Sequence, residues 1–184
     1  QELDPTRDIP FRPPYAARPK LENQKRQDMY DLVVLLLDTG ARYGEIANIP
    51  WTRIDLENRT INLWRPKVRN ESIIYMTSRV HAILTRRSED RQGEYVFCNQ
   101  EGEARGYAAK GIRLCIKNAG LEDFKIHDLR HTAASRLIQN GMSLYEVAQI
   151  LGHTDVQTTQ RYAHLAQVDV SKRARDIMES MGNH

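Results

Sequence analysis

The chain has 184 residues, enough for one well-buried domain, and contains no apolar run near the roughly 20 residues that a membrane-spanning helix requires. It carries 27 Lys and Arg against 24 Asp and Glu, so a nucleic-acid partner would be recognised by the distribution of charge rather than by its total. Cys98 and Cys115 lack metal-like spacing, which favours free thiols in a reducing, cytosolic setting.

The first 21 residues differ in composition from the rest of the chain, because five of the seven prolines occur there. Proline fixes φ and removes a backbone donor, so residues 1–21 are predicted to form an extended linker. Apolar residues then recur at helical spacing, which predicts a helix over 22–38 that ends at Gly40, a residue that tolerates a left-handed exit. A shorter helix over 44–49 is stopped by Pro50.

The middle of the chain alternates between strand and helix signals. Residues 60–64 and 72–77 are rich in β-branched and aromatic side chains, which predicts two strands of a hairpin with Lys67 in the turn. Three further elements are predicted before residue 120: helices over 80–88 and 107–118, and a short strand at 95–97.

Basic residues gather in three clusters, and each cluster has two interpretations. One is an ordinary solvated surface, and the other is a set of contacts to DNA phosphates. The clusters are Arg65, Lys67 and Arg69; Arg86, Arg87 and Arg91; and Arg105, Lys110, Arg113 and Lys117.

The last third of the chain is helical, with clear signals at the helix ends. A helix over 127–139 is expected to close near Gly141. Ser143 and Glu146 form a capping box for a second helix, which ends at Gly152.

Two more helices are predicted towards the end of the chain. Thr154 and Gln157 form another capping box, which opens the helix that is predicted to hold Tyr162. An amphipathic stretch over 170–181 places four apolar residues on one side: Ala174, Ile177, Met178 and Met181.

Five short motifs follow one another along the chain: TGARYGE at 39–45, PK at 66–67, HDLRH at 127–131, LGH at 151–153 and QRYAH at 160–164. In this order and spacing they resemble the catalytic domain of the tyrosine recombinase family, the phage-type integrases, over about residues 22–165. The resemblance implies an α+β fold that is mainly α with a small antiparallel β-sheet. It also singles out six side chains as catalytic: Arg42, Lys67, His127, Arg130, His153 and Tyr162.

These side chains suit the breaking and rejoining of a DNA phosphodiester. Attack on the phosphate adds negative charge, so donors aimed at the non-bridging oxygens stabilise the transition state, each by on the order of 3 kcal/mol. Arg42 and Arg130 match the family's two arginines, whose planar fork grips two oxygens and keeps its proton. Glu45 is expected to share a helical face with Arg42 and steady it by charge, and the alternative is an ordinary solvated glutamate.

Tyr162 matches the family's nucleophile and follows His153 by nine residues. A tyrosine hydroxyl has a pKa of about 10, so attack at neutral pH needs nearby arginines and a histidine that accepts the proton. Lys67 resembles the family's general acid, which protonates the departing 5′-oxygen. Arg65 and Arg69 alternate with Lys67 in the same loop, and Val68 replaces the usual glycine, so the choice among these cations stays open.

His127 and Arg130 are three residues apart on a predicted helix, so they share a face and can converge on one phosphate. By the resemblance, His127 hydrogen-bonds the phosphate or takes the proton of the tyrosine, and His153 donates to a non-bridging oxygen. His131 is expected to pack against this site or support it. The remaining histidines match no motif position and are assigned no role: His81, His164 and His184.

Three other functions share parts of this pattern. HDLRH is similar to the HExxH zinc motif, with His127 and His131 at positions i and i+4, but Arg130 on the same face would repel a divalent cation. A type IB topoisomerase uses a similar set of residues and would relax any supercoiled plasmid rather than join two sites. The third alternative is a DNA-binding module without catalysis.

The resemblance also implies partners and a setting. We expect a site-specific recombinase that cleaves and rejoins DNA through a 3′-phosphotyrosyl intermediate, needs no cofactor, and integrates or excises a phage or mobile element. Its partners would be double-stranded recombination sites, other copies in a homotetramer and accessory DNA-bending proteins, in the bacterial cytoplasm and not at a membrane. Residues 22–167 would be the catalytic domain and 168–184 a helical tail that docks in cis or on a neighbouring copy. A separate DNA-binding domain is expected before the linker.

Overall fold

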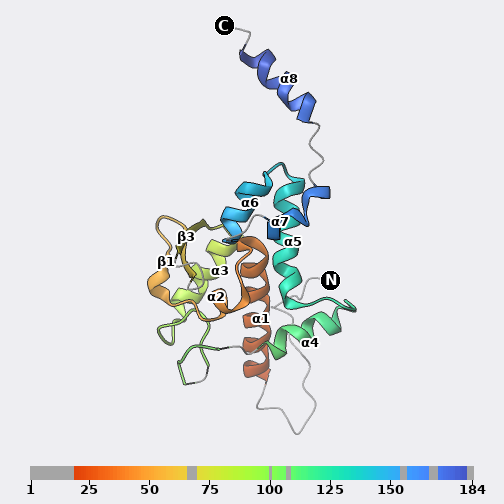
Figure 1. Cartoon of the computed structure of the whole chain (residues 1–184). Helices are drawn as coiled ribbons and strands as arrows, with labels where there is room; N and C mark the ends of the chain where they lie inside the picture. Colours follow the sequence, from red (N-terminus) through yellow and green to blue (C-terminus); the bar gives the residue numbers. More distant parts are fainter. Residues whose placement is uncertain are drawn as a thin grey trace. The chain divides into compact units, whose positions relative to one another are not determined.

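The structure is a computed structural model, and it describes residues 19–65, 70–99, 101–106, 109–153, 157–165 and 170–181. Figure 1 shows a mainly helical chain with one small sheet, which confirms the predicted fold class. The α-helices are α1 Pro19–Thr39, α2 Tyr43–Ala47, α3 Ser78–Glu89, α4 Lys110–Asn118, α5 Ile126–Gln139, α6 Leu144–Leu151, α7 Gln157–Gln160 and α8 Val170–Met181. The strands are β1 Ile54–Asp55, β2 Thr60–Arg65 and β3 Asn70–Tyr75, and the 3₁₀ helices are η1 Trp51–Arg53 and η2 Ala163–Leu165.

The chain divides into two compact units, residues 1–133 and 134–184, and the division falls inside α5. Residues 1–18 of the linker predicted over 1–21 lie outside the described residues. Residues 19–21 are helical and not linker, because α1 begins at Pro19 rather than at residue 22. Proline is well tolerated at the first helical position, where its missing N–H would have no partner within the helix.

The sheet of the first unit is antiparallel, in the order β1-β2-β3. The predicted hairpin is confirmed, with β2 and β3 paired in register from Thr60 opposite Tyr75 to Arg65 opposite Asn70. Its turn, where Lys67 was predicted, lies outside the described residues. Strand β1 carries no periodic signal because it is two residues long, and the sequence did not predict it.

The strand predicted at 95–97 is wrong. Tyr95 makes only an isolated bridge to Pro50, although Val96 N–H still donates to the carbonyl of Ile49 at 3.0 Å. The apolar signal came from Val96 and Phe97, which are buried in the hydrophobic core without belonging to the sheet. A short apolar run reports burial more reliably than it reports strand pairing.

Helix α1 is central to the core of the first unit. Leu32, Leu35 and Leu36 are buried to 1% exposure or less and belong to the same cluster as side chains of β2, α3 and α4. Burying a leucine side chain stabilises a fold by about 1.5–3 kcal/mol. The burial of these three leucines therefore makes a large contribution to packing α1 into the core of the first unit. Helix α4 lies so close to it that a Cβ at Gly111 would be 2.6 Å from Sδ of Met29.

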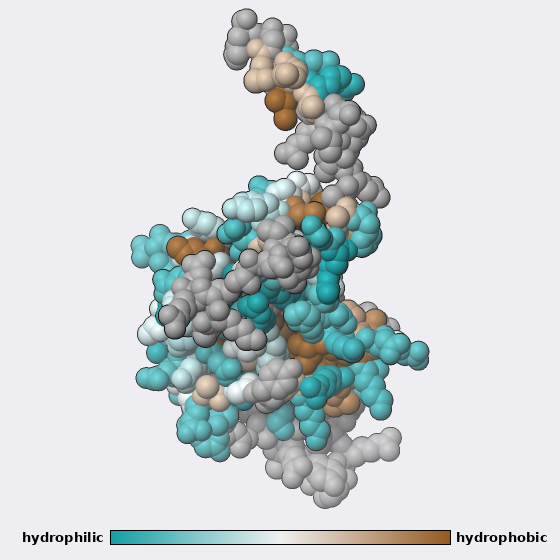
Figure 2. Space-filling model, viewed as in Figure 1, coloured by the Kyte–Doolittle hydropathy of each residue, from teal (hydrophilic) through white to brown (hydrophobic). Residues whose placement is uncertain are grey.

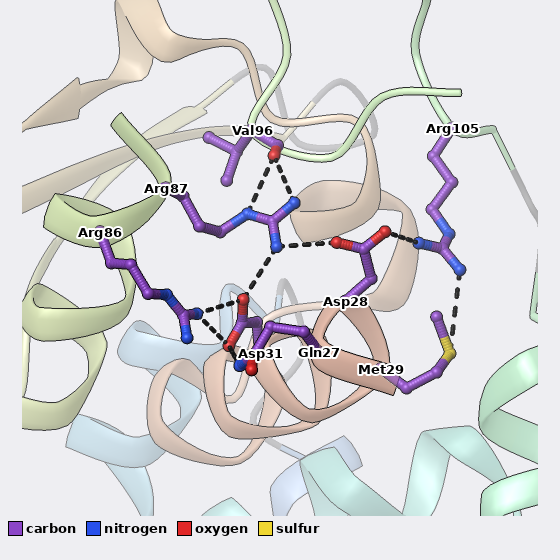
Figure 3. A network of polar contacts seen from close by, with 8 residues as sticks. All are labelled: Gln27, Asp28, Met29, Asp31, Arg86, Arg87, Val96 and Arg105. Atoms are coloured by element: carbon purple, nitrogen blue, oxygen red, sulfur yellow. Dashed lines mark hydrogen bonds and ion pairs between the residues drawn. The ribbon is translucent and has the colours of Figure 1, made fainter. Parts of the chain in front are cut away.

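A polar network also holds α1 against α3, as Figure 3 shows. Asp31, fully buried on α1, accepts from Nη2 of Arg86 at 2.6 Å and from Nη1 of Arg87 at 2.8 Å. Arg87 also contacts Asp28 at 2.8 Å, and Asp28 in turn lies 3.5 Å from Nη1 of Arg105. Because three arginines from the predicted basic clusters are paired inside this unit, those clusters are not simply a surface for DNA.

The end of α1 is tied to the start of α3 by a second set of contacts. Asp38 accepts from Oγ1 of Thr77 at 2.5 Å and from Nε of Arg79 at 2.7 Å. Thr77 is also the N-cap of α3 and accepts from the backbone N–H of Val80. These contacts fix the end of α1 against α3 directly before the TGARYGE motif begins at Thr39.

The second unit has a small core of its own, built from the end of α5, from α6 and from the segment after α7: Ala134, Ile138, Val147, Leu151 and Tyr162. The predicted capping box of α6 is present, since Ser143 Oγ accepts from Glu146 N–H and Glu146 Oε2 accepts from Ser143 N–H. Gly141 and Gly152 both take a positive φ at the predicted helix ends, 95° and 64°. The predicted Thr154–Gln157 box lies partly outside the described residues.

Helix α8 confirms the predicted amphipathic stretch. Ile177, Met178 and Met181 are exposed to 51%, 67% and 60%. Figure 2 shows hydrophobic and hydrophilic residues on different sides of this helix. Among the described residues, no helix is long and apolar enough to cross a membrane.

Candidate active site

A pocket of about 200 Å³ in the first unit collects three of the predicted catalytic residues. It is smaller than the roughly 300–1,000 Å³ of ordinary small-molecule sites, so it suits one charged group rather than a whole ligand. Its lining residues come from the segment that joins α1 to α2, from the start of α2 and from the first half of α5: Ala41, Arg42, Tyr43, Gly44, Ile126, His127 and Arg130.

Arg42 is positioned by the way that α1 ends. The hydroxyl of Thr39 donates to the carbonyl of Leu35 at 2.6 Å and accepts from Ala41 N–H at 3.2 Å. Gly40 has a φ of 61°, a conformation that a side chain would strain, and it turns the chain out of the helix. Arg42 then adopts an extended backbone directly before α2, which brings it to the pocket.

Glu45 holds Arg42 by two hydrogen bonds. Its Oε2 accepts from the backbone N–H of Arg42 at 2.8 Å, and its Oε1 accepts from Nη1 at 2.8 Å. The predicted contact between these residues is therefore present, but they do not share a helical face, because Arg42 is the extended N-cap residue before α2. The side chain of Glu45 is only 10% exposed, so its charge is less screened than that of a surface carboxylate.

Arg65 shares the same carboxylate, whereas the sequence had offered it only as an alternative to Lys67 in the hairpin loop. Its Nε lies 3.7 Å from Oε1 of Glu45, and its side chain is 3% exposed. Burial lowers the pKa of the Arg65 guanidinium from its ordinary value, and the charge of Arg42 lowers it further while Glu45 opposes both effects. The burial of Arg65 could have been predicted from the alternation of side chains along β2, because Ile61, Leu63 and Arg65 occupy its buried positions.

Arg130 joins the pocket from α5, and its guanidinium lies at the end of α1. Its Nη1 donates to the carbonyl of Gly40 at 2.8 Å, and the residue is 3% exposed. The last turn of α1 has no basic residue of its own, so Arg130 supplies the positive charge that a helix C-terminus favours.

His127 lines the pocket three residues before Arg130, as the helical spacing predicted. Its ring contacts that of His131 edge to face, with centroids 4.7 Å apart, so His131 packs against the site as expected. Among the described residues, no three His, Cys, Asp or Glu side chains gather as a metal ion would need.

His153 and Tyr162 belong to the second unit, where both contact Thr159. Gly152 ends α6, and the backbone N–H of His153 donates to the carbonyl of Ala148 at 2.9 Å. The Nδ1 of His153 lies 2.8 Å from Oγ1 of Thr159, whose carbonyl accepts from the N–H of Tyr162 at 3.0 Å. Sequence analysis missed Thr159.

Tyr162 does not lie in a helix, contrary to the prediction. Helix α7 ends at Gln160, and Tyr162 occupies the turn before η2. Its ring is 6% exposed and packs in the core of the second unit. Helix α7 has four residues, about one turn, and a helix this short gains little stability from its own backbone hydrogen bonds.

A family model described as the phage integrase family matches residues 19–168. The chain belongs to this family. This integrase-family chain is 26% identical over 183 residues to the integrase of Salmonella phage P22. The alignment covers 92% of the chain and 47% of that protein. It is 30% identical over 149 residues to tyrosine recombinase XerA of Saccharolobus solfataricus, covering 81% and 50%. The chain thus spans about half the length of the curated relatives that it matches.

Solved structures agree with this family assignment. The crystal structure of XerA recombinase has a TM-score of 0.68 and 27% identity, over 96% of this chain and 65% of that one. XerH site-specific recombinase bound to its difH substrate has a TM-score of 0.67 and 26% identity, over 81% and 46%. The catalytic domain of bacteriophage HP1 integrase, at 23% identity and a TM-score of 0.63 over 80% and 81%, supports the fold.

Proposed function

We propose that this chain is the strand-cleaving and strand-joining part of a site-specific DNA recombinase. The observation that carries the proposal is the pocket lined by Arg42, His127 and Arg130. Two guanidinium groups and an imidazole at one small pocket suit the non-bridging oxygens of a single phosphodiester. Preorganised donors of this kind stabilise the charge that develops in the transition state, and Arg130 is also buried.

The proposed reaction is a pair of transesterifications. The phenolic oxygen of Tyr162 attacks phosphorus, the bond to the 5′-oxygen breaks, and a 3′-phosphotyrosyl link forms. Lys67 protonates the departing 5′-oxygen, and His127 accepts the phenolic proton. The 5′-hydroxyl of a partner strand then attacks the link and releases Tyr162. One phosphoester bond is exchanged for another at each step, so the reaction draws on no ATP.

His153 and Arg130 have supporting roles in this proposal. His153 donates to a non-bridging oxygen, and Arg130 binds the same phosphate while its Nη1 remains bonded to the carbonyl of Gly40. Glu45 steadies Arg42 through the two hydrogen bonds at its backbone and side chain.

The biological process that we propose is integration or excision of a phage or other mobile element in the bacterial cytoplasm. Similarity to the P22 integrase supports it, as does 29% identity over 172 residues to transposase A from transposon Tn554 of Staphylococcus aureus. Relatives named integrase and recombinase favour this function over a type IB topoisomerase or a DNA-binding module without catalysis.

Replacing Tyr162 by Phe tests the proposal. The probe is a library of nicked DNA duplexes with a randomised central segment, in which the cleaved strand cannot be rejoined. The wild-type chain is expected to leave a covalent protein–DNA adduct under denaturing conditions. Tyr162→Phe should lower the yield by about 10³-fold or more, because it removes the nucleophile and keeps the buried ring.

Tyr145→Phe is the matched control, since Tyr145 is an exposed tyrosine of the same unit. It should give the wild-type yield. An adduct of undiminished yield with Tyr162→Phe, or none with the wild-type chain on any sequence of the library, contradicts the proposed function.

Assembly on DNA is a separate part of the proposal. We propose that four copies act together, helped by accessory DNA-bending proteins, and that α8 docks on a neighbouring copy through its exposed apolar side. In support, Ile177, Met178 and Met181 are all more than half exposed. Deleting residues 168–184 should reduce the mass of the DNA complex in sedimentation and leave the adduct yield per copy unchanged. An unchanged complex mass would show that α8 is not needed for assembly.

A further inference from the structure

We propose that Thr159 is a positioning residue that holds His153 and Tyr162 in a common local frame. The inference rests on the function proposed above. It starts from the two contacts of Thr159: its hydroxyl oxygen lies 2.8 Å from Nδ1 of His153, and its carbonyl accepts from the N–H of Tyr162 at 3.0 Å. One residue thus reaches one candidate catalytic residue through its side chain and the other through its backbone.

The contact to Nδ1 decides which ring nitrogen of His153 serves the substrate. A phosphate oxygen only accepts hydrogen bonds, so the nitrogen that faces it must carry a proton. With Nδ1 directed at Thr159, the nitrogen left for the phosphate is Nε2. A hydroxyl can donate to a neutral imidazole or accept from an imidazolium, so Thr159 keeps the ring in place in both protonation states.

Burial makes this contact rigid. Thr159 has no exposed surface, and the β-branched side chain of threonine has few rotamers. A buried hydroxyl needs a hydrogen-bond partner, and His153 provides it. Because the same residue fixes the carbonyl that accepts from Tyr162, a change that moves the Thr159 backbone would also shift the start of the turn that carries the nucleophile.

Two substitutions of Thr159 separate the hydroxyl from the shape of the side chain. Thr159→Val keeps the branched shape and removes the hydrogen bond, while Thr159→Ser keeps the hydroxyl. Thr85→Val is the matched control, because the Thr85 hydroxyl is buried and has no hydrogen-bond partner among the described residues. All variants are made in the full 184-residue chain, and urea unfolding checks that each one folds.

The first measurement is the rate of adduct formation on a nicked duplex recovered from the random library. Thr159→Val should be roughly 5- to 10-fold slower than wild type, as expected for the loss of one buried hydrogen bond. Its pH–rate profile should also change in shape, because Nδ1 of His153 loses the hydrogen bond to the Thr159 hydroxyl. Thr159→Ser and Thr85→Val should keep the wild-type profile.

The second measurement needs no activity. The ¹⁵N shifts of the His153 ring nitrogens report which nitrogen is protonated and whether Nδ1 is hydrogen-bonded, and the His153→Gln spectrum assigns them among the six histidines. They should move in Thr159→Val and stay in Thr159→Ser. If the wild type forms no adduct, the proposed function fails while the shifts still decide on the contact. Unmoved shifts, or a folded Thr159→Val variant with the wild-type rate and pH profile, overturn the role of Thr159.

Discussion

The two units hold their candidate catalytic residues by different means. In the first unit the decisive contacts join distant parts of the sequence: Arg130 and Gly40 are 90 residues apart, and Arg87 and Asp31 are 56 apart. In the second unit His153 and Thr159 are six residues apart, and Tyr162 follows Thr159 by three. The candidate cation Arg130 therefore depends on a completed tertiary fold. Arg42 is held locally by Glu45, three residues away, and the candidate nucleophile Tyr162 and its neighbouring histidine likewise depend on a short segment of chain.

Arg130→Lys tests the long-range side of this comparison and has the largest expected effect. Lysine lacks the planar fork, so it cannot bind Gly40 and two phosphate oxygens in the same geometry. We expect adduct formation to slow by about 10²–10³-fold, as for the loss of one preorganised transition-state donor. The rate on a selected nicked duplex measures it. Arg136→Lys, an exposed change on the same helix, should have no effect.

An Arg130→Lys variant that cleaves within a few-fold of wild type would mean that charge alone matters at this position. The contrast between Arg130, which is held by a long-range contact, and the candidate nucleophile Tyr162, which is held locally, would then lose its strongest support.

Asp31→Asn probes the same scaffold away from the pocket. Asp31 is fully buried, and removing its charge takes away one of the two α1 carboxylates that lie 2.8 Å from Nη1 of Arg87, whose side chain is only 13% exposed. The free energy of unfolding in urea should fall by about 3 kcal/mol, at the lower end for breaking a buried pair because Arg86 is 43% exposed.

Asp176→Asn is the control for that measurement, since Asp176 pairs with Arg175 at the surface of α8. An exposed pair of this kind contributes less than about 1 kcal/mol. Equal effects of the two substitutions would show that the network around Asp31 does not stabilise the first unit.

Sequence patterns predicted the features that short segments determine. The helix ends at Gly40 and Gly152 and the capping box at Ser143 depend on neighbouring residues only, and all three are present. The β2–β3 hairpin is also local, so alternation was enough to find it. The pocket residues Arg42, His127 and Arg130 came from motif order, which carries information about spatial proximity that periodicity lacks.

The features that were missed depend on tertiary contacts or on very short elements. Nothing near Asp31 in the sequence indicates that Arg86 and Arg87 of α3 will neutralise its charge. From the sequence alone, the same two arginines are equally consistent with a DNA-binding surface. The sequence indicated that Arg65 was a cation of the hairpin loop, but it is the last residue of β2 and lies on the buried face of that strand. Thr159 carried no motif of its own, and the turn at Tyr162 was mistaken for helix because α7 stops after four residues.

The bond between Arg130 and the carbonyl of Gly40 has a consequence for genetics. From Asp31 to Gly40 the chain rises by roughly 14 Å along α1, so the Arg87 and Arg130 contacts hold the same helix at two points that far apart. On the proposed function, a selection for loss of recombination should therefore recover changes at Arg87, which does not line the pocket, alongside changes at Arg130 itself. Suppressors of the Arg87 changes would be found along α1 rather than beside the scissile phosphate.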